Sequence, residues 1–160
     1  MTISTVKIDY TNTEQANDLV FLLSSYALDP MGGEAALPNH VKDNLARRLS
    51  ELPHAFSIIS YVAGKPAALA NCFDAFSTFA CAPLINVHDI IVLKEFRGLG
   101  LSQKLLDKIE EIAREKECCK ITLEVLSGNK VAQNSYRKFG FAPYSLDPEA
   151  GEALFWQKKL

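Results

Sequence analysis

Apolar residues recur along this chain with two spacings, and the alternation between them predicts both helices and strands. Apolar positions three and four residues apart are typical of amphipathic helices, whereas alternating or continuous β-branched runs favour strands. Helical spacing occupies residues 14–28, 39–52, 99–116 and 129–139. Strand patterns occupy residues 3–9, 55–63, 66–76, 85–93, 121–125, 141–145 and 153–158. This mixture predicts an α/β fold, and a length of 160 residues suits a single domain over residues 1–160.

One segment places a buried strand directly before a glycine-rich turn and the start of a helix. The apolar run IIVL at 90–93 is followed by RGLGLS at 97–102, which leads into an amphipathic helix. The helix dipole and several backbone N–H groups would point at the turn, and the glycines would let an anion approach closely. The segment therefore predicts a phosphate-binding turn. It matches neither G-x-G-x-x-G nor G-x-x-x-x-G-K-[ST], which argues against dinucleotide and nucleoside triphosphate sites.

Two blocks of this chain resemble motifs of the GCN5-related N-acetyltransferase (GNAT) superfamily. The turn at 97–102 is similar to the pyrophosphate-binding motif Q/R-x-x-G-x-G/A of that family, with Ser102 departing from the usual small last residue. About 30 residues later, Asn129, Ala132, Tyr136 and the pair at 140–141 resemble the family's downstream helix motif. The resemblance covers roughly residues 55–160.

The resemblance implies a fold, a co-substrate and a set of binding residues. The fold would be a central mixed, mostly antiparallel sheet of about seven strands flanked by about four helices. The co-substrate would be acetyl-CoA, with no metal. The main chain of Ile90, Ile91 and Val92 would bind its pantetheine arm. The residues expected at its pyrophosphate and along its arm are Arg97, Gly98, Leu99, Gly100, Leu101, Ser102, Gln103 and Asn129.

The resemblance also implies catalytic roles for two residues. Taken from the sequence alone, each of them could instead have a purely structural role. Tyr136 would be the general acid that protonates the departing thiolate, yet Ala132, Tyr136 and Phe139 also form a stripe typical of a helix core. His88 precedes Ile90 where several family members carry a glutamate, so it is the candidate base, or else a core or edge histidine. Strand alternation predicts that Asp89 points to the opposite face from His88.

The composition of the chain limits which classes of binding partner and which cellular compartment are expected. The chain is 48% apolar with a formal net charge of −2 and no basic stripe, which argues against nucleic acid as the main ligand. No apolar run approaches the ~20 residues that cross a bilayer, and the first residues lack the pattern of a signal peptide. The cysteines form no C-x-x-C pair and lie at no metal-ligand spacing with the histidines. We therefore expect reduced thiols and a cytoplasmic protein without a metal or membrane partner.

These observations lead to the hypothesis of an acetyl-CoA-dependent N-acetyltransferase that acts on a primary amine of a small molecule. The acceptor pocket would be built by the loop at 29–34, Tyr26, Asn71 and Phe73, with Phe76 and Phe79 either lining it or packing the sheet. Two alternatives stay open: a protein lysine or N-terminal acetyltransferase, and a non-catalytic acyl-CoA-binding regulatory module. A homodimer is possible, and the segment 155–156 would serve either that contact or the core.

Overall fold

The computed structural model describes all 160 residues and contains one sheet with helices on both faces. The strands are β1 (Ile3–Lys7), β2 (Ala55–Val62), β3 (Lys65–Ser77), β4 (Ala82–Val92) and β5 (Ile121–Leu123). The α-helices are α1 (Thr13–Ala27), α2 (Asn39–Ser50), α3 (Leu101–Glu115) and α4 (Lys130–Phe139). Single 3₁₀ turns lie at η1 (Pro30–Gly32), η2 (Lys94–Phe96) and η3 (Pro148–Ala150). The four predicted helices are confirmed to within two residues at each end.

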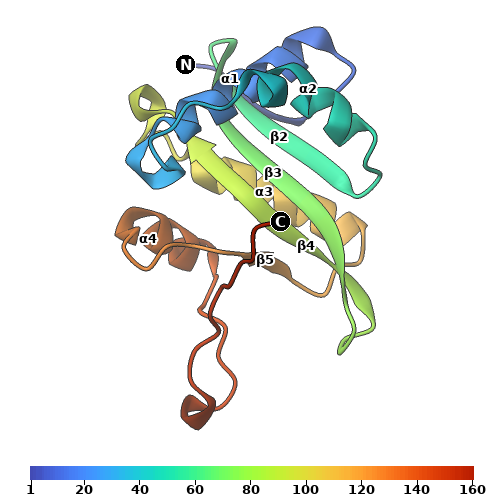
Figure 1. Cartoon of the computed structure of the whole chain (residues 1–160), viewed down its shortest axis with the longest axis vertical. Coiled ribbons are helices and arrows are strands. Elements are labelled where there is room, and N and C mark those ends of the chain that lie inside the picture. The colour runs from blue at the N-terminus through green and yellow to red at the C-terminus, as the bar shows by residue number, and fades with distance from the viewer.

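The strands follow one another in the sheet in the order of the sequence, β1-β2-β3-β4-β5 (Figure 1). The first four strands pair antiparallel, and β5 joins the edge parallel to β4. A parallel pair needs a long crossover, and α3 supplies it between β4 and β5. The predicted mixed, mostly antiparallel sheet is therefore confirmed.

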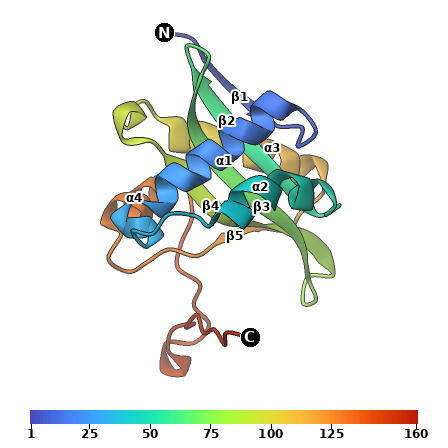
Figure 2. The ribbon, with the colours of Figure 1, turned by 45° about the horizontal axis from the view of Figure 1, so that its top comes forward.

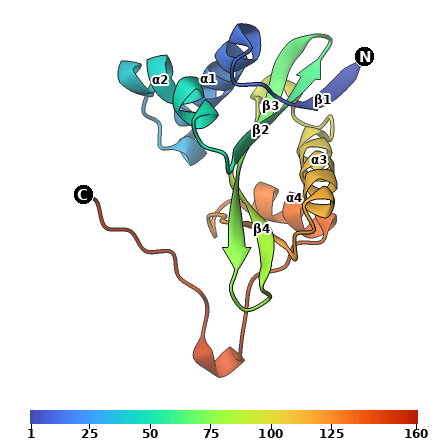
Figure 3. The ribbon, with the colours of Figure 1, turned by 90° about the vertical axis from the view of Figure 1, so that its right-hand side faces the viewer.

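Each face of the sheet has its own apolar core. Figures 2 and 3 show α1 and α2 on one face and α3 on the other. Side chains of β3 alternate between these faces: Ala68 and Ala70 join the core beneath α3, and Leu69 joins the core beneath α1. The predicted apolar stripe of α3 is buried in the first of these cores, and its members are Leu101, Leu105, Ile109 and Ile112.

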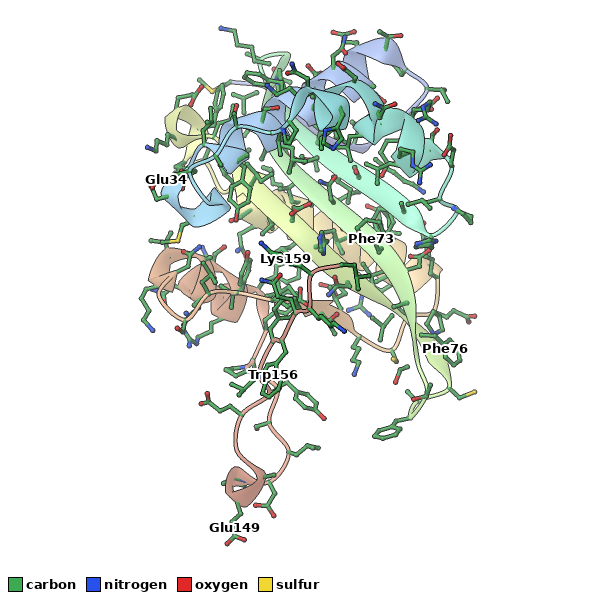
Figure 4. All side chains as sticks on the ribbon, in the orientation of Figure 1. Glu34, Phe73, Phe76, Glu149, Trp156 and Lys159 are labelled. Atoms are coloured by element: carbon green, nitrogen blue, oxygen red, sulfur yellow. The ribbon has the colours of Figure 1, made fainter.

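The two strands predicted over 141–145 and 153–158 are wrong, so the sheet has five strands and not about seven. These segments share only one isolated bridge, between Ser145 and Glu152, and Figure 3 shows them running away from the sheet. Their side-chain alternation is typical of strands, but a strand also needs a partner edge, and Pro143 lacks a backbone N–H. Trp156, labelled in Figure 4, is 83% exposed, so a core role for the segment 155–156 is also wrong. Its role in a dimer stays a prediction.

The η1 turn is folded tightly against the end of α1. The Asp29 carboxylate accepts a hydrogen bond from the Met31 backbone N–H at 3.0 Å, and the Tyr26 hydroxyl donates to the Met31 carbonyl at 3.1 Å. A Cβ at Gly32 would lie 1.9 Å from the carbonyl oxygen of Tyr26, so only glycine fits there without movement of the backbone. This packing fixes the segment 29–33 near the end of β4.

We predict that Gly32→Ala lowers the free energy of unfolding by about 1–3 kcal/mol, because the added methyl group forces the η1 turn away from α1. Gly128→Ala is the matched control, since a Cβ at Gly128 would meet no atom within 4 Å. Chemical denaturation of both variants measures the difference. Equal stabilities for the two variants would contradict the packing described here.

Candidate active site

Strands β4 and β5 pair over only three residues and then separate. Ile85, Asn86 and Val87 pair with residues 121–123, and beyond this point β5 no longer accompanies β4. The outer edge of Ile90–Val92 therefore has no neighbouring strand, and its backbone groups are open to a ligand. A cavity of about 500 Å³ lies at this separation. Its lining comes from Tyr26, Asp29, Pro30, Met31, Ile90, Ile91, Val92, Lys94, Arg97, Gly98, Gly100, Leu101, Ser102, Asn129, Val131, Ala132, Ser135 and Tyr136.

The glycine-rich turn forms one end of this cavity. Gly98 and Gly100 have φ angles of 82° and 73°, values that favour glycine, and a Cβ at either would meet no protein atom within 4 Å. No side chain caps the N-terminus of α3, and its first turn contains no acidic residue. The N–H groups of that turn and the positive end of the helix dipole are thus available to an anion. The turn thus has the features that the predicted phosphate site requires.

Arg97 lies between the turn and the opposite wall of the cavity. Its Nη2 is 3.3 Å from Oδ2 of Asp29, and its Nε donates to the carbonyl of Val92 at 3.3 Å. The pKa of Asp29 is lowered, first by the hydrogen bond from the Met31 N–H and then by Arg97. Because the guanidinium is more than half exposed, it can turn toward a bound anion at little cost.

A cluster of polar side chains joins the N-terminal turn of α3 to α4. The Oγ atoms of Ser102 and Ser135 are 2.9 Å apart, and the Gln103 side-chain amide donates to the carbonyl and the hydroxyl of Ser135, both at 3.0 Å. Gln103 is therefore engaged with α4, and it does not line the cavity. Leu99 also lies outside the cavity lining, with its side chain partly exposed.

Asn129 and Tyr136 are the residues by which α4, on the same side as α3, contributes to the cavity. Asn129 caps the helix by accepting a hydrogen bond from the Ala132 N–H at 3.1 Å, and it lines the cavity. Tyr136 is 7% exposed, and its ring packs edge-on against Phe141 at 6.0 Å. The residue lines the cavity. Burial, followed by the charge of Tyr26, raises the pKa of Tyr136 to about 12.

A bulge in β4 changes the expected direction of Asp89. Asn71 of β3 pairs with Asp89 and Cys72 pairs with Val87, so His88 is an extra residue in the strand. The His88 ring packs edge-on against Phe73 at 5.6 Å, and Asp89 accepts a hydrogen bond from Asn71. Because Asn71 and Phe73 are two apart on one strand, His88 and Asp89 lie on the same face of the sheet. The prediction of opposite faces is therefore wrong.

The remaining predicted acceptor residues divide into two groups. Tyr26 and the first residues of the loop at 29–34 line the cavity, whereas Asn71 and Phe73 do not. Phe76, near the end of β3 (Figure 4), is 58% exposed, and Phe79 in the β3–β4 hairpin is fully exposed. Neither lines the cavity. His88 is exposed and is not among the residues that line the cavity.

Three lining residues were missed by the sequence analysis, namely Lys94, Val131 and Ser135. Val131 lies in the first turn of α4, and Ser135 holds α4 to α3. Ser135 lies four residues after Val131 and three after Ala132, so these residues share one helix face, and that spacing is the signal that could have identified them.

The structure also bears on metal binding, on disulfide bonds and on membrane-spanning helices. No group of three or more histidine, cysteine, aspartate and glutamate side chains is arranged to hold a metal ion. All four cysteines are free thiols. None of the helices combines the length and the apolar character that a membrane crossing would need.

Two acetyltransferases from other organisms align with parts of this chain. Over 56 residues it is 39% identical to the thialysine N-epsilon-acetyltransferase of Bos taurus, an alignment of 35% of this chain and 33% of that protein. The chain thus spans about a third of the length of that relative. Over 102 residues it is 31% identical to a candidate ribosomal protein bS18-alanine N-acetyltransferase of Bacillus subtilis (strain 168), 64% of each chain.

Solved structures share the whole fold at low sequence identity. An integron cassette protein from the mobile metagenome of V. cholerae superposes with a TM-score of 0.79 at 20% identity, covering 99% of this chain and 93% of that one. AAC(6')-Iy in complex with a bisubstrate analog, CoA-S-monomethyl-acetylneamine, gives a TM-score of 0.77 at 16% identity over 100% of both chains. Residues 23–141, most of the sequence, match the acetyltransferase (GNAT) family, and the chain belongs to that family.

Proposed function

We propose that this chain transfers the acetyl group of acetyl-CoA to a primary amine of a small molecule, with both substrates bound together. The observation that carries the proposal is the cavity at which the glycine turn, the open edge of β4 and Tyr136 meet. Each supplies one requirement of the reaction: N–H groups for a diphosphate, main-chain groups for the pantetheine amides, and a proton for the leaving sulfur.

The binding roles follow from the positions of the residues. The N–H groups from Gly98 to Ser102 hold the diphosphate, and Arg97 adds charge beside them. The outer edge of Ile90–Val92 pairs with the pantetheine arm as a short strand would. Asn129 borders the same path at the start of α4.

The chemistry requires one proton to leave the amine and another to reach sulfur. The neutral amine attacks the thioester carbonyl, the C–N bond forms, and a main-chain N–H near Ile91 stabilises the oxyanion. The C–S bond then breaks, and Tyr136 donates its proton to the thiolate. His88, exposed on the β4 bulge, takes the proton of the amine through water. The products are an N-acetylated amine and coenzyme A.

A second candidate acceptor is the N-terminal amine of a protein. It is favoured by the alignment with the Bacillus subtilis relative, whose name gives an alanine of a ribosomal protein as its acceptor. The chemistry would be the same, and only the acceptor would differ.

The glycine turn gives a first prediction. Gly100→Val should weaken acetyl-CoA binding at least about tenfold, because the side chain would occupy the space in front of the N–H groups and strain the backbone at φ 73°. Gly64→Val is the matched control, since Gly64 also has a positive φ of 77° but lies in the β2–β3 hairpin. Titration calorimetry measures the affinity of both variants for acetyl-CoA. Unchanged affinity in Gly100→Val would rule out the diphosphate site.

An amine panel tests the transfer itself. Wild-type protein and Tyr136→Phe are incubated with acetyl-CoA and thialysine, neamine, a polyamine or a peptide that begins with alanine, and mass spectrometry detects the acetylated product. We expect turnover with one of the small amines and a fall of about 10²-fold or more in kcat for Tyr136→Phe, since general acid catalysis contributes that much.

The affinity of Tyr136→Phe for acetyl-CoA should stay within about threefold of wild type, because the substitution removes a single hydroxyl. Acetylation of the peptide alone would favour the second candidate. Tight acetyl-CoA binding without any product would favour the non-catalytic module, and full kcat in Tyr136→Phe would remove Tyr136 from the mechanism.

The raised pKa of Tyr136 gives a pH prediction. An ordinary tyrosine loses its proton around pH 10.0, whereas Tyr136 keeps its proton until the pH approaches about 12. The acid form therefore persists at alkaline pH, and kcat should not fall between about pH 8 and about pH 10. The pH profile of kcat, corrected for spontaneous thioester hydrolysis, provides the test. A decline with a midpoint below pH 10 that disappears in Tyr136→Phe would contradict it.

A further inference from the structure

Two adjacent cysteines between α3 and β5 line a cavity that the proposed reaction does not use. This thiol cavity has a volume of about 300 Å³, and Cys118 and Cys119 both contribute to its wall. Cys119 is exposed and Cys118 is partly buried. The glycine turn and the two cysteines lie at opposite ends of α3, a helix of 15 residues and about 20 Å. The two cavities share no lining residue.

The fold holds the backbone of both cysteines in place. After α3 the chain turns at Glu117, which has a φ of 55°, and the Cys118 N–H donates to the carbonyl of Ala113 at 2.9 Å. This turn packs Cys118 against the core beneath α3. The Cys119 N–H donates to the carbonyl of Pro83, near the start of β4, at 2.9 Å. An ordered backbone therefore presents both thiols to one cavity, and a ligand that takes both sulfurs would not have to order that backbone.

Apart from the thiols, the thiol cavity has charged groups and an apolar side. Glu110 is the one carboxylate in its lining, and Nε of Arg114 donates to that carboxylate at 2.9 Å. The two sulfur atoms are therefore the soft ligand atoms that the cavity presents. The apolar members of its wall are Ala113, Ile121, Phe139 and Phe141.

The spacing of the two cysteines favours a bridging atom over a bond between the sulfurs. Adjacent Cα atoms across a trans peptide are about 3.8 Å apart, whereas a disulfide needs about 4.4–6.8 Å. A larger atom that bonds to both sulfurs does not require them to come within bonding distance of each other. Zinc takes three or four protein ligands, but trivalent arsenic that carries one organic group is complete with two sulfurs.

We propose that Cys118 and Cys119 form a dithiol site for a trivalent organic arsenical, whose organic group lies against the apolar side of the thiol cavity. The arsenical, R–As=O, condenses with the two S–H groups. Two As–S bonds form, the As=O bond breaks, and the oxygen leaves as water with the two thiol protons, so arsenic stays trivalent. The site stands independently of the transfer reaction, because it shares no residue with the cavity at the glycine turn.

Phenylarsine oxide is the probe for this site. Reduced wild-type protein should bind one equivalent, measured by intact-mass spectrometry and by titration calorimetry. The adduct should survive an excess of 2-mercaptoethanol and be removed by 2,3-dimercaptopropanol, because a chelate resists a monothiol but exchanges with another dithiol. Cys118→Ser and Cys119→Ser should each weaken binding by about 10²-fold or more, since the second As–S bond forms at the high effective concentration of a neighbouring thiol.

A cysteine elsewhere in the chain and a peptide supply the controls. Cys81→Ser should bind like wild type, because Cys81 is an exposed cysteine of the β3–β4 hairpin, away from α3. The peptide EKECCKIT, residues 115–122, offers the same two thiols without the cavity. Folded protein should bind phenylarsine oxide about tenfold more tightly than this peptide. Circular dichroism verifies that each variant is folded.

Each part of the inference has an outcome that would overturn it. Absence of an adduct in wild-type protein, or its loss in Cys81→Ser, would remove the site from residues 118–119. Full affinity in either Cys118→Ser or Cys119→Ser would mean that arsenic is held by a single thiol. Equal affinity of the protein and the peptide would remove the cavity from the site.

Discussion

The early separation of β4 from β5 is the constraint on which the rest of this structure depends. Backbone N–H and C=O groups at a sheet edge need partners, and water or a ligand must supply them when a neighbouring strand is missing. The edge of Ile90–Val92 is therefore both a gap in the sheet and a surface with regular hydrogen-bonding capacity. Everything else near the cavity is arranged around this edge: the N-termini of α3 and α4 on one side and the η1 turn on the other.

Most of this architecture could be predicted from the sequence, because helices and turns depend on residues that are close together in the chain. The stripe of α3 with Leu105 and Ile109 has helical spacing, and the turn with Gly98 and Gly100 requires positive φ. Asn129 as a helix cap and Tyr136 on the same helix follow from spacing as well. Helices α1 to α4 were predictable for the same reason, since a helix satisfies its own backbone within one segment.

The spacing of apolar residues could not predict features that depend on pairing between distant segments. The bulge at His88 is a shift of one residue in the register of β4 with β3, and no residue near it indicates that shift in the sequence. It reverses the face on which Asp89 lies, so simple alternation gave the wrong direction. The segments after Phe141 have the alternation of strands, but only the structure reveals that they lack a partner edge.

The bonds of Ser102 and Gln103 to Ser135 have a consequence for how a ligand reaches the cavity. They fasten α3 to α4, so the two helices behave as one rigid wall and would have to break several interactions at once to move apart. The opposite wall is tethered to the sheet through Arg97 and Asp29, an exposed ion pair of the kind that is worth about 1 kcal/mol or less. Exchange of Asp29 for a bound anion at Arg97 is therefore the least demanding change, and the coenzyme would bind between two walls that keep their positions.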